Sequence, residues 1–434
     1  MAVLKLKQDG IWYKIVAGKW TPELFGVQEG EPCVSISTEV VGGARWQQKE
    51  LSLPMDEPYL KEWGWQRCVA EGMDSMELYR WLYRCAKEGF TVDYRTIMMD
   101  GVEQEPVAVD GGTDLAFAIA RAYGDTSAGS LEWFGKQYPS DPENFRVMNI
   151  PLMQFEGLSE ETLLNVIYRV KEDNPELCFL LFPSDSQALP VLRENGSYKT
   201  LYCIAPTGKK RKEMVDVMRK ARAYVHDKVY HLYGIEAGKP LSVEQKKKVL
   251  KIIHDWIILH GWSSETESNG SGLEVNYLSN TAYAALDPAR IALCGGYTQA
   301  FNYMARSFSI HAIYMSGYAY RNASQTDGDG HTWCAVQMSD NYEYGTYSQE
   351  PQDWSCIDVY WDEPAHEAAY GGAAPVRDDV IWRYFLDVDT IFQSYPRHEI
   401  DSSKGYGTLP CGDAEPCANY KYEGNALYRW EELE

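Results

Sequence analysis

The segment 292–305 constrains the fold more than any other part of this 434-residue chain. It reads Ala-Leu-Cys-Gly-Gly-Tyr-Thr-Gln-Ala-Phe-Asn-Tyr-Met-Ala, which indicates a loop that ends at a cysteine where a helix begins. The free backbone N–H groups and the dipole at a helix N-terminus favour the thiolate of Cys294 over its thiol. Gly295 and Gly296 have no Cβ, so backbone and substrate can approach the sulfur closely. A helix that merely starts with a buried cysteine and small residues would explain the same segment.

A histidine at the entry of a predicted strand is the second functional candidate. Gly-His-Thr-Trp (330–333) follows a turn-rich stretch, and an alternating apolar strand begins at or near His331. An imidazole that faces a helix terminus can act as base for a thiol and then as acid for a leaving amine. A purely structural histidine is the alternative interpretation.

The third candidate is an aspartate among strand residues. Asp358 lies in the run Cys-Ile-Asp-Val-Tyr-Trp-Asp (356–362), and a carboxylate that is buried there needs a partner. The Nδ1–H of a catalytic histidine is the natural one, because the carboxylate orients the ring and stabilises the imidazolium. Cys294, His331 and Asp358, in this order, lead to the hypothesis of a thiol-protease-type triad.

Read together, CGGYTQAF, GHTW and IDVYWD resemble the transglutaminase-like superfamily, whose members are papain-fold enzymes with a Cys-His-Asp triad. The resemblance covers about 150–434 and is strongest over 240–400. Four further segments are similar to those of bacterial members: DNPE (173–176), IIHDWI (252–257), TAYAALDP (281–288) and RYFLDVDTIFQSYPRH (383–398).

The resemblance implies a role for each member of the triad. Cys294 is expected to be the nucleophile, His331 the general acid/base and Asp358 the orienting carboxylate. The backbone N–H of Cys294 would be one oxyanion donor. The second donor stays open, because the two candidates, Tyr277 and Tyr283, can also be core residues. The expected oxyanion and cleft residues are Tyr277, Tyr283, Gly295, Gly296 and Trp333.

The resemblance implies an α+β fold, with the nucleophile at a helix N-terminus packed on an antiparallel sheet, as in papain-like and transglutaminase-like domains. A smaller mixed N-terminal region precedes this domain. We expect a β-rich segment over 1–55, a mostly helical region of unknown role over 56–145 and a lead-in α/β region over 146–240. The transglutaminase-like catalytic domain is expected over 241–434.

Capping patterns and apolar periodicity predict individual elements. Ser159 is expected to cap a helix, and a capping box at Ser242 opens another that ends at Gly261. Residues 208–233 predict a long amphipathic helix, and 178–182 predict a strand. Two further strands are expected over 11–16 and 34–38, and two further helices are expected to start at Asp74 or Ser75 and to cover 113–124.

Charge limits the classes of partner. The chain has 41 Lys and Arg against 63 Asp and Glu, a net charge of −22, whereas a nucleic-acid binder needs a basic face. No run approaches the roughly 18–20 apolar residues that cross a bilayer. The first residues carry Lys with no apolar stretch behind them, so we expect no signal peptide, no membrane partner and a cytoplasmic protein.

Metal and cofactor signals are weak. The ten cysteines include no Cys-x-x-Cys pair, which removes the best zinc signal. Cys411 and Cys417 can pair or supply half of a metal site, but nothing nearby completes four ligands. We therefore expect no cofactor and no metal. Core or surface roles are expected for His254 and His260, and solvated surface for the acidic groups Asp362-Glu363, Asp378-Asp379 and Asp387/Asp389, which lack EF-hand spacing.

The expected chemistry is acyl transfer through a thioester at Cys294. Water as acceptor gives peptide-bond cleavage or glutamine deamidation in protein or peptide substrates, and a lysine or polyamine acceptor gives cross-linking. Hydrolysis is preferred by analogy with smaller microbial members. A non-catalytic interaction module on the same fold is the alternative, and 1–145 can dock a partner.

Overall fold

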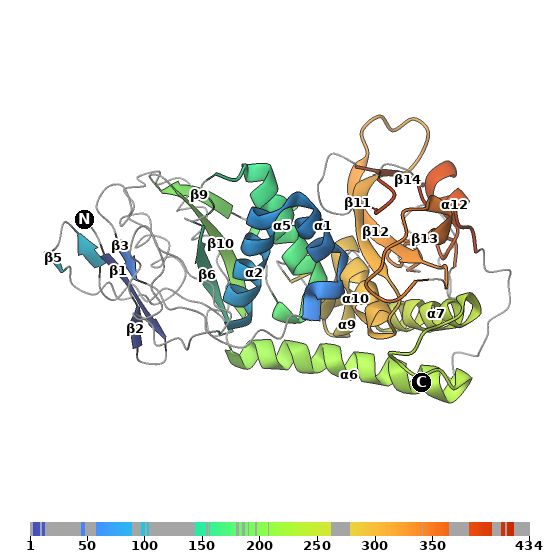
Figure 1. Cartoon of the computed structure of the whole chain (residues 1–434). Helices are drawn as coiled ribbons and strands as arrows, with labels where there is room; N and C mark the ends of the chain where they lie inside the picture. The colour runs from blue at the N-terminus through green and yellow to red at the C-terminus, as the bar shows by residue number, and fades with distance from the viewer. Residues whose placement is uncertain are drawn as a thin grey trace. The chain divides into compact units, whose positions relative to one another are not determined.

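The computed structural model (Figure 1) describes the long stretches 58–88, 157–178, 208–261, 278–340, 342–363 and 382–401. Shorter described segments lie within 3–13, 45–47, 97–103, 144–155, 182–206 and 409–420. The predicted strand over 34–38 and the predicted helix over 113–124 lie outside the described residues.

The chain forms two compact units. The first comprises 1–59 and 67–212, and the second comprises 60–66 and 213–434. The finer division into four parts that the sequence suggests stays a prediction. Among the described helices, none combines the length and the apolar character that crossing a membrane requires.

One sheet of the first unit is built on its first strand. β1 (Val3–Gln8) pairs antiparallel with β2 (Ile11–Tyr13) and with β4 (Ile97–Met99), and it pairs in parallel with β3 (Arg45–Gln47). β5 (Val102–Glu103) continues the sheet beyond β4. The strand predicted over 11–16 is therefore present at its first three residues.

A second sheet of this unit has β10 (Tyr198–Pro206) at its centre, between β6 (Phe145–Pro151) and β9 (Val191–Asn195). Both neighbours run antiparallel to β10. β7 (Phe182–Ser184) and β8 (Gln187–Leu189) form a separate antiparallel pair.

Helices α2 (Met73–Glu88) and α5 (Glu160–Asp173) of the first unit pack against each other. α1 (Trp63–Glu71) leads into α2, which begins one residue before the earliest predicted start. Ser159 caps α5 as predicted, because its hydroxyl accepts the backbone N–H of Thr162 at 3.1 Å. Local capping chemistry thus sets where this helix begins.

The strand predicted over 178–182 is wrong at its first residue. The Asn-Pro step ends α5, and a 3₁₀ turn, η4 (Pro175–Leu177), follows. Cys178 closes that turn with a left-handed φ of 52°, which a strand does not adopt, and β7 begins only at Phe182. The other described 3₁₀ turns are η2 (Pro58–Lys61) and η5 (Pro351–Asp353).

Two long helices lead into the second unit, and both were predicted. α6 (Gly208–Tyr233) covers the whole predicted range. α7 (Val243–His260) begins with the predicted capping box at Ser242 and ends at Gly261, whose N–H donates to the carbonyl of Ile257 at 2.6 Å. Most of α7 is buried, including the polar residues Lys246, Lys251, His254 and Asp255.

A curled antiparallel sheet positions the functional candidates. Its strand order is β13 (Trp354–Ile357), β12 (Asp329–Gln337), β11 (Ala312–Tyr320) and β14 (Arg397–Ile400). α10 (Cys294–Ser307) packs on β12 and β11, as Figure 1 shows. The expected α+β arrangement, with a helix that starts at Cys294 on an antiparallel sheet, is therefore present.

Two short helices complete this unit. α9 (Ala282–Leu286) packs against α10 and α7, and α12 (Val388–Gln393) packs against β14 and β13. Asp387 caps α12, because its carboxylate accepts the N–H of Thr390 at 3.1 Å. The expectation that Asp387 lies on a solvated surface is wrong, since only 3% of it is exposed.

A glycine on β11 lets the edge strand β14 pack closely against β11. Gly317 on β11 lies opposite His331 on β12 and Ile400 on β14. A Cβ at this position would lie 2.0 Å from the backbone oxygen of Glu399 and 2.8 Å from the Trp333 ring. Any other residue would push β14 away, so this glycine supports the placement of the side chains that β14 carries.

Candidate active site

Cys294 is the first residue of α10, as the sequence predicts. The residue is partly exposed to solvent, and the N–H groups of a first helical turn have no helical acceptors. The glycines that follow lie against the preceding loop. A Cβ at Gly295 would lie 2.7 Å from Oδ1 of Asn280, and one at Gly296 would lie 2.5 Å from the carbonyl of Ser279. Close packing of this loop therefore requires both glycines.

His331 lies in β12 and is buried. Its Nε2 lies 2.6 Å from Oδ2 of Asp358, so the expectation of a contact through Nδ1 is wrong. Asp358 lies in the turn after β13, and α10, which begins at Cys294, packs on β12, so the two groups approach His331 from different elements. The His331 ring lies near enough to the Cys294 thiol for each group to shift the pKa of the other.

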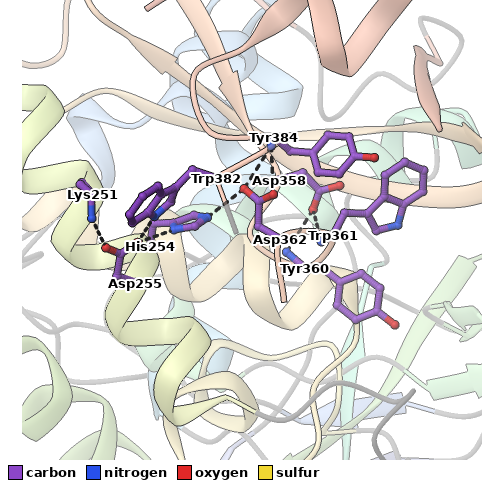
Figure 2. A network of polar contacts seen from close by, with 9 residues as sticks. All are labelled: Lys251, His254, Asp255, Asp358, Tyr360, Trp361, Asp362, Trp382 and Tyr384. Carbon is purple, nitrogen blue, oxygen red and sulfur yellow. Dashed lines mark hydrogen bonds and ion pairs between the residues drawn. The ribbon is translucent and has the colours of Figure 1, made fainter. Parts of the chain in front are cut away.

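Asp358 follows β13 directly and lies in a turn rather than within the strand. Its carboxylate accepts four hydrogen bonds. Oδ1 accepts the backbone N–H groups of Tyr360 at 3.1 Å and Trp361 at 3.2 Å (Figure 2). Oδ2 accepts Nε2–H of His331 at 2.6 Å and of His398 at 2.8 Å. The carboxylate is therefore fixed on both oxygens.

Electrostatics favour a charged thiolate and imidazolium. Burial lowers the pKa of His331, but the charge and hydrogen bond of Asp358 raise it to about 10. Burial raises the pKa of Cys294, but the hydrogen bond and charge of His331 outweigh burial and leave this pKa below the ordinary thiol value. Burial raises the pKa of Asp358, and His331 and His398 reverse this and hold it below its usual range.

Other cysteines in this unit lie in the opposite environment. Burial raises the pKa of the Cys334 thiol far above its ordinary value, and it also raises that of Cys356. Cys417 is exposed and is a free thiol, so no disulfide joins it to Cys411. Cys294 thus combines a lowered pKa with partial access to solvent, as thiol nucleophiles require.

His398 contacts Asp358 in the structure, although the sequence assigned it no role. It is the last residue of the family-like segment 383–398, and only the pairing of β14 with β11 brings it to Asp358. Its exposed fraction is 1%. A histidine at the end of a recognised segment was the available signal, but its contact partner lies 40 residues away in the chain.

The other predicted cleft residues differ in whether they lie close to His331, Asp358 and His398. Trp333 is fully buried, and its ring centroid lies 6.2 Å from that of His331 and 4.8 Å from that of His398. Burial, together with the neighbouring Asp287, raises the pKa of Tyr283 to about 12. Tyr277 lies outside the described residues, so the choice of a second oxyanion donor stays a prediction.

His331, Asp358 and His398 each offer a metal-ligating atom, and these atoms lie within 4.8 Å of one another. All three side chains are buried. Both Nε2 atoms lie at hydrogen-bond distance from the same carboxylate oxygen, which accepts only, so each imidazole directs a proton at it. A cation would have to displace both protons, and the donor set therefore fits a hydrogen-bonded cluster better than a metal centre.

A second buried network lies beside the Asp358 turn (Figure 2). Nδ1 of His254 lies 2.8 Å from Oδ1 of Asp255, and its Nε2 lies 3.0 Å from Oδ2 of Asp362. Both nitrogens face carboxylates, so both donate and the ring is an imidazolium. Burial lowers the pKa of His254, and the two carboxylates outweigh burial and raise it. Lys251 pairs with the other oxygen of Asp255.

Backbone and indole groups tie this network to the turn. Trp382 Nε1 donates to Asp255 at 2.8 Å, and the backbone N–H of Tyr384 donates to Asp362 at 2.9 Å. The N–H of Asp362 donates to the carbonyl of Asp358 at 3.2 Å. Burial raises the pKa of Asp362 to about 6. The expectation that Asp362 and Glu363 are solvated is wrong, since their exposed fractions are 0% and 6%.

Comparison with known proteins agrees with this geometry. No curated protein matches the chain. The family model described as the transglutaminase-like superfamily matches residues 239–355. The match contains Cys294 and His331 and ends shortly before Asp358. Within the second unit, residues 239–355 thus match a transglutaminase-like superfamily domain.

Proposed function

We propose that the protein catalyses acyl transfer through a thioester at Cys294, with His331 as acid/base and Asp358 as orienting carboxylate. The hydrogen bond between Nε2 of His331 and the buried Asp358 carboxylate, beside a partly exposed cysteine whose pKa His331 lowers, carries this proposal. Thiolate and imidazolium are the forms that begin such a reaction. The match to the transglutaminase-like superfamily supports cysteine-dependent chemistry of this general kind.

The steps follow from the hydrogen bonds of the cluster. The Cys294 thiolate attacks the substrate carbonyl carbon. The oxyanion that forms accepts a hydrogen bond from the backbone N–H of Cys294 at the start of α10. His331 then passes its Nδ1 proton to the leaving amine as the thioester forms. In the second half, His331 takes a proton from the incoming acceptor, which attacks the thioester and releases the thiolate. Asp358 keeps Nε2 protonated in both halves.

The acceptor decides the overall reaction. Water gives hydrolysis of a peptide bond or of a glutamine side-chain amide, which is our preferred outcome by analogy with smaller microbial members of the family. A lysine amine gives a cross-link if it reaches the thioester before water does. A non-catalytic interaction module is the competing proposal, and an occluded site would favour it.

The test compares wild type with Cys294→Ala on casein in the presence of a fluorescent primary amine. Intact-mass and peptide analysis separates fragments, amide-to-acid conversion and amine incorporation. We expect a product that wild type forms and Cys294→Ala does not, with fragments or deamidated glutamine in excess over labelled casein. Cys417→Ala is the matched control, because Cys417 is an exposed free thiol and its loss should leave the product unchanged. Equal product in wild type and Cys294→Ala would contradict the proposal.

A further inference from the structure

Asp358 has two imidazole partners, and the triad hypothesis uses only one of them. We propose that His398 is a positioning residue for the acyl-transfer reaction proposed above: it shares Oδ2 of Asp358 with His331, which fixes the carboxylate and limits how strongly the carboxylate holds the His331 proton. The inference rests on the proposed function, but its test also has a readout that needs no substrate.

The hydrogen-bond geometry assigns the proton on His398. Its Nε2 lies 2.8 Å from Oδ2 of Asp358, the same oxygen that lies 2.6 Å from Nε2 of His331. An ionised carboxylate only accepts hydrogen bonds, so both imidazoles donate to this atom. One oxygen therefore divides its negative charge between two N–H donors, whereas a simple triad gives it to one.

The surroundings of His398 hold its ring in this orientation. Its ring centroid lies 4.6 Å from that of Trp361 and 4.8 Å from that of Trp333. Nδ1 lies 3.2 Å from the carbonyl oxygen of Ile391 on α12. An aromatic hydrocarbon would fill this pocket without the cost of burying two ring nitrogens. The group that distinguishes histidine here is the Nε2–H on Asp358.

The groups around His398 act in opposite directions on its charge. The titratable groups around it are Asp358 after β13, His331 on β12 and Tyr384 before α12, whose ring centroid lies 5.9 Å away. Burial and the nearby His331 lower the pKa of His398, while Asp358 and the carbonyl of Ile391 raise it. In either protonation state Nε2–H can donate to the Asp358 anion, so the role of the ring at Oδ2 does not depend on its charge.

Removal of this donor has a predictable direction. With His398→Leu, Oδ2 of Asp358 has only His331 as partner and binds its proton more tightly. The pKa of His331 should rise, and proton transfer to the leaving group should slow. We expect kcat to fall by about 10–100-fold, the usual effect of losing a partner that orients a functional ligand, with KM unchanged because His398 is buried and does not reach the substrate.

The experiment compares wild type, His398→Leu and His398→Gln, whose amide N–H can replace the Nε2–H but does not titrate. Iodoacetamide alkylation of Cys294 is followed against pH, and kcat and KM are measured with the substrate that the casein assay identifies. We expect the upper inflection of the alkylation profile, where His331 loses its proton, to move to higher pH in His398→Leu and to return in His398→Gln. The loss in kcat should follow the same pattern.

Two results would overturn the inference: equal loss in the Leu and Gln variants, or an unchanged upper inflection in a folded His398→Leu. If the Leu variant does not fold, His398→Gln decides alone, because a loss as large as that of Asp358→Ala would contradict donor replacement. A wild type without Cys294-dependent product would refute the proposed function. The alkylation profiles would still report on His398, so the two failures are distinguishable.

Discussion

Replacing Asp358 with alanine is expected to lower kcat/KM by about 10³–10⁴-fold, the scale of losing the carboxylate of a catalytic triad. The carboxylate accepts hydrogen bonds from His331, His398 and two backbone N–H groups. Without it, burial lowers the pKa of His331, and of the groups that raise this pKa only Cys294 remains. Thiolate and imidazolium then no longer coexist at neutral pH, and the ring loses its orientation. Steady-state kinetics on folded protein, checked by circular dichroism, measures the effect.

Asp358→Asn separates orientation from charge. The amide oxygen can still accept a hydrogen bond from His331, but the negative charge that raises the pKa of His331 is absent. We expect intermediate activity and an alkaline limb of kcat/KM at lower pH than in wild type. Asp389→Asn, which removes an exposed carboxylate on α12, should leave both parameters unchanged. A folded Asp358→Ala variant within tenfold of wild type would show that Asp358 does not support the reaction.

Replacing His254 with alanine is expected to lower the free energy of unfolding by about 3–5 kcal/mol, the cost of removing one member of a buried ion pair. The imidazolium lies between Asp255 and Asp362, and all three residues have exposed fractions of 0%. Alanine leaves Asp362 with a backbone N–H donor but without a neutralising charge. Urea unfolding measures the loss, and hydrogen exchange of α7 amides locates it.

His231→Ala is the matched control for this change. His231 also contacts an aspartate, with Nε2 at 3.2 Å from Oδ1 of Asp227, but both side chains are more than 60% exposed, at 68% and 63%. Exposed pairs of this kind contribute little, so the midpoint should not move measurably. Equal midpoints for His254→Ala and wild type would contradict the view that the network stabilises this unit.

Features that depend on local chemistry were predictable from the sequence. A cap at Ser159, a capping box at Ser242 and a helix that starts at Cys294 are all confirmed. Each depends on residues within one turn, where side chain and backbone N–H groups meet regardless of the rest of the fold. The glycine at Gly261 that ends α7 is local in the same way.

Features that depend on distant packing were not predictable. The sequence around Asp362 predicts a polar surface position, but Asp362 pairs with His254, 108 residues away, because α7 lies beside the turn after β13. His398 reaches Asp358 only because β14 pairs with β11 at a glycine. Cys178 shows the reverse case, since an apolar run predicts a strand but the preceding Asn-Pro step forces a left-handed turn.

The most direct test of the central claim is the pH dependence of iodoacetamide alkylation, with peptide mapping of every cysteine in wild type and in His331→Ala. We expect Cys294 to be alkylated first near neutral pH, ahead of the exposed Cys417 and the buried Cys334. In His331→Ala this advantage should disappear, because the imidazole that lowers the pKa of Cys294 is gone. A Cys294 that stays inert while Cys417 reacts, or whose rate is unchanged in His331→Ala, would contradict the assignment of Cys294 as the nucleophile.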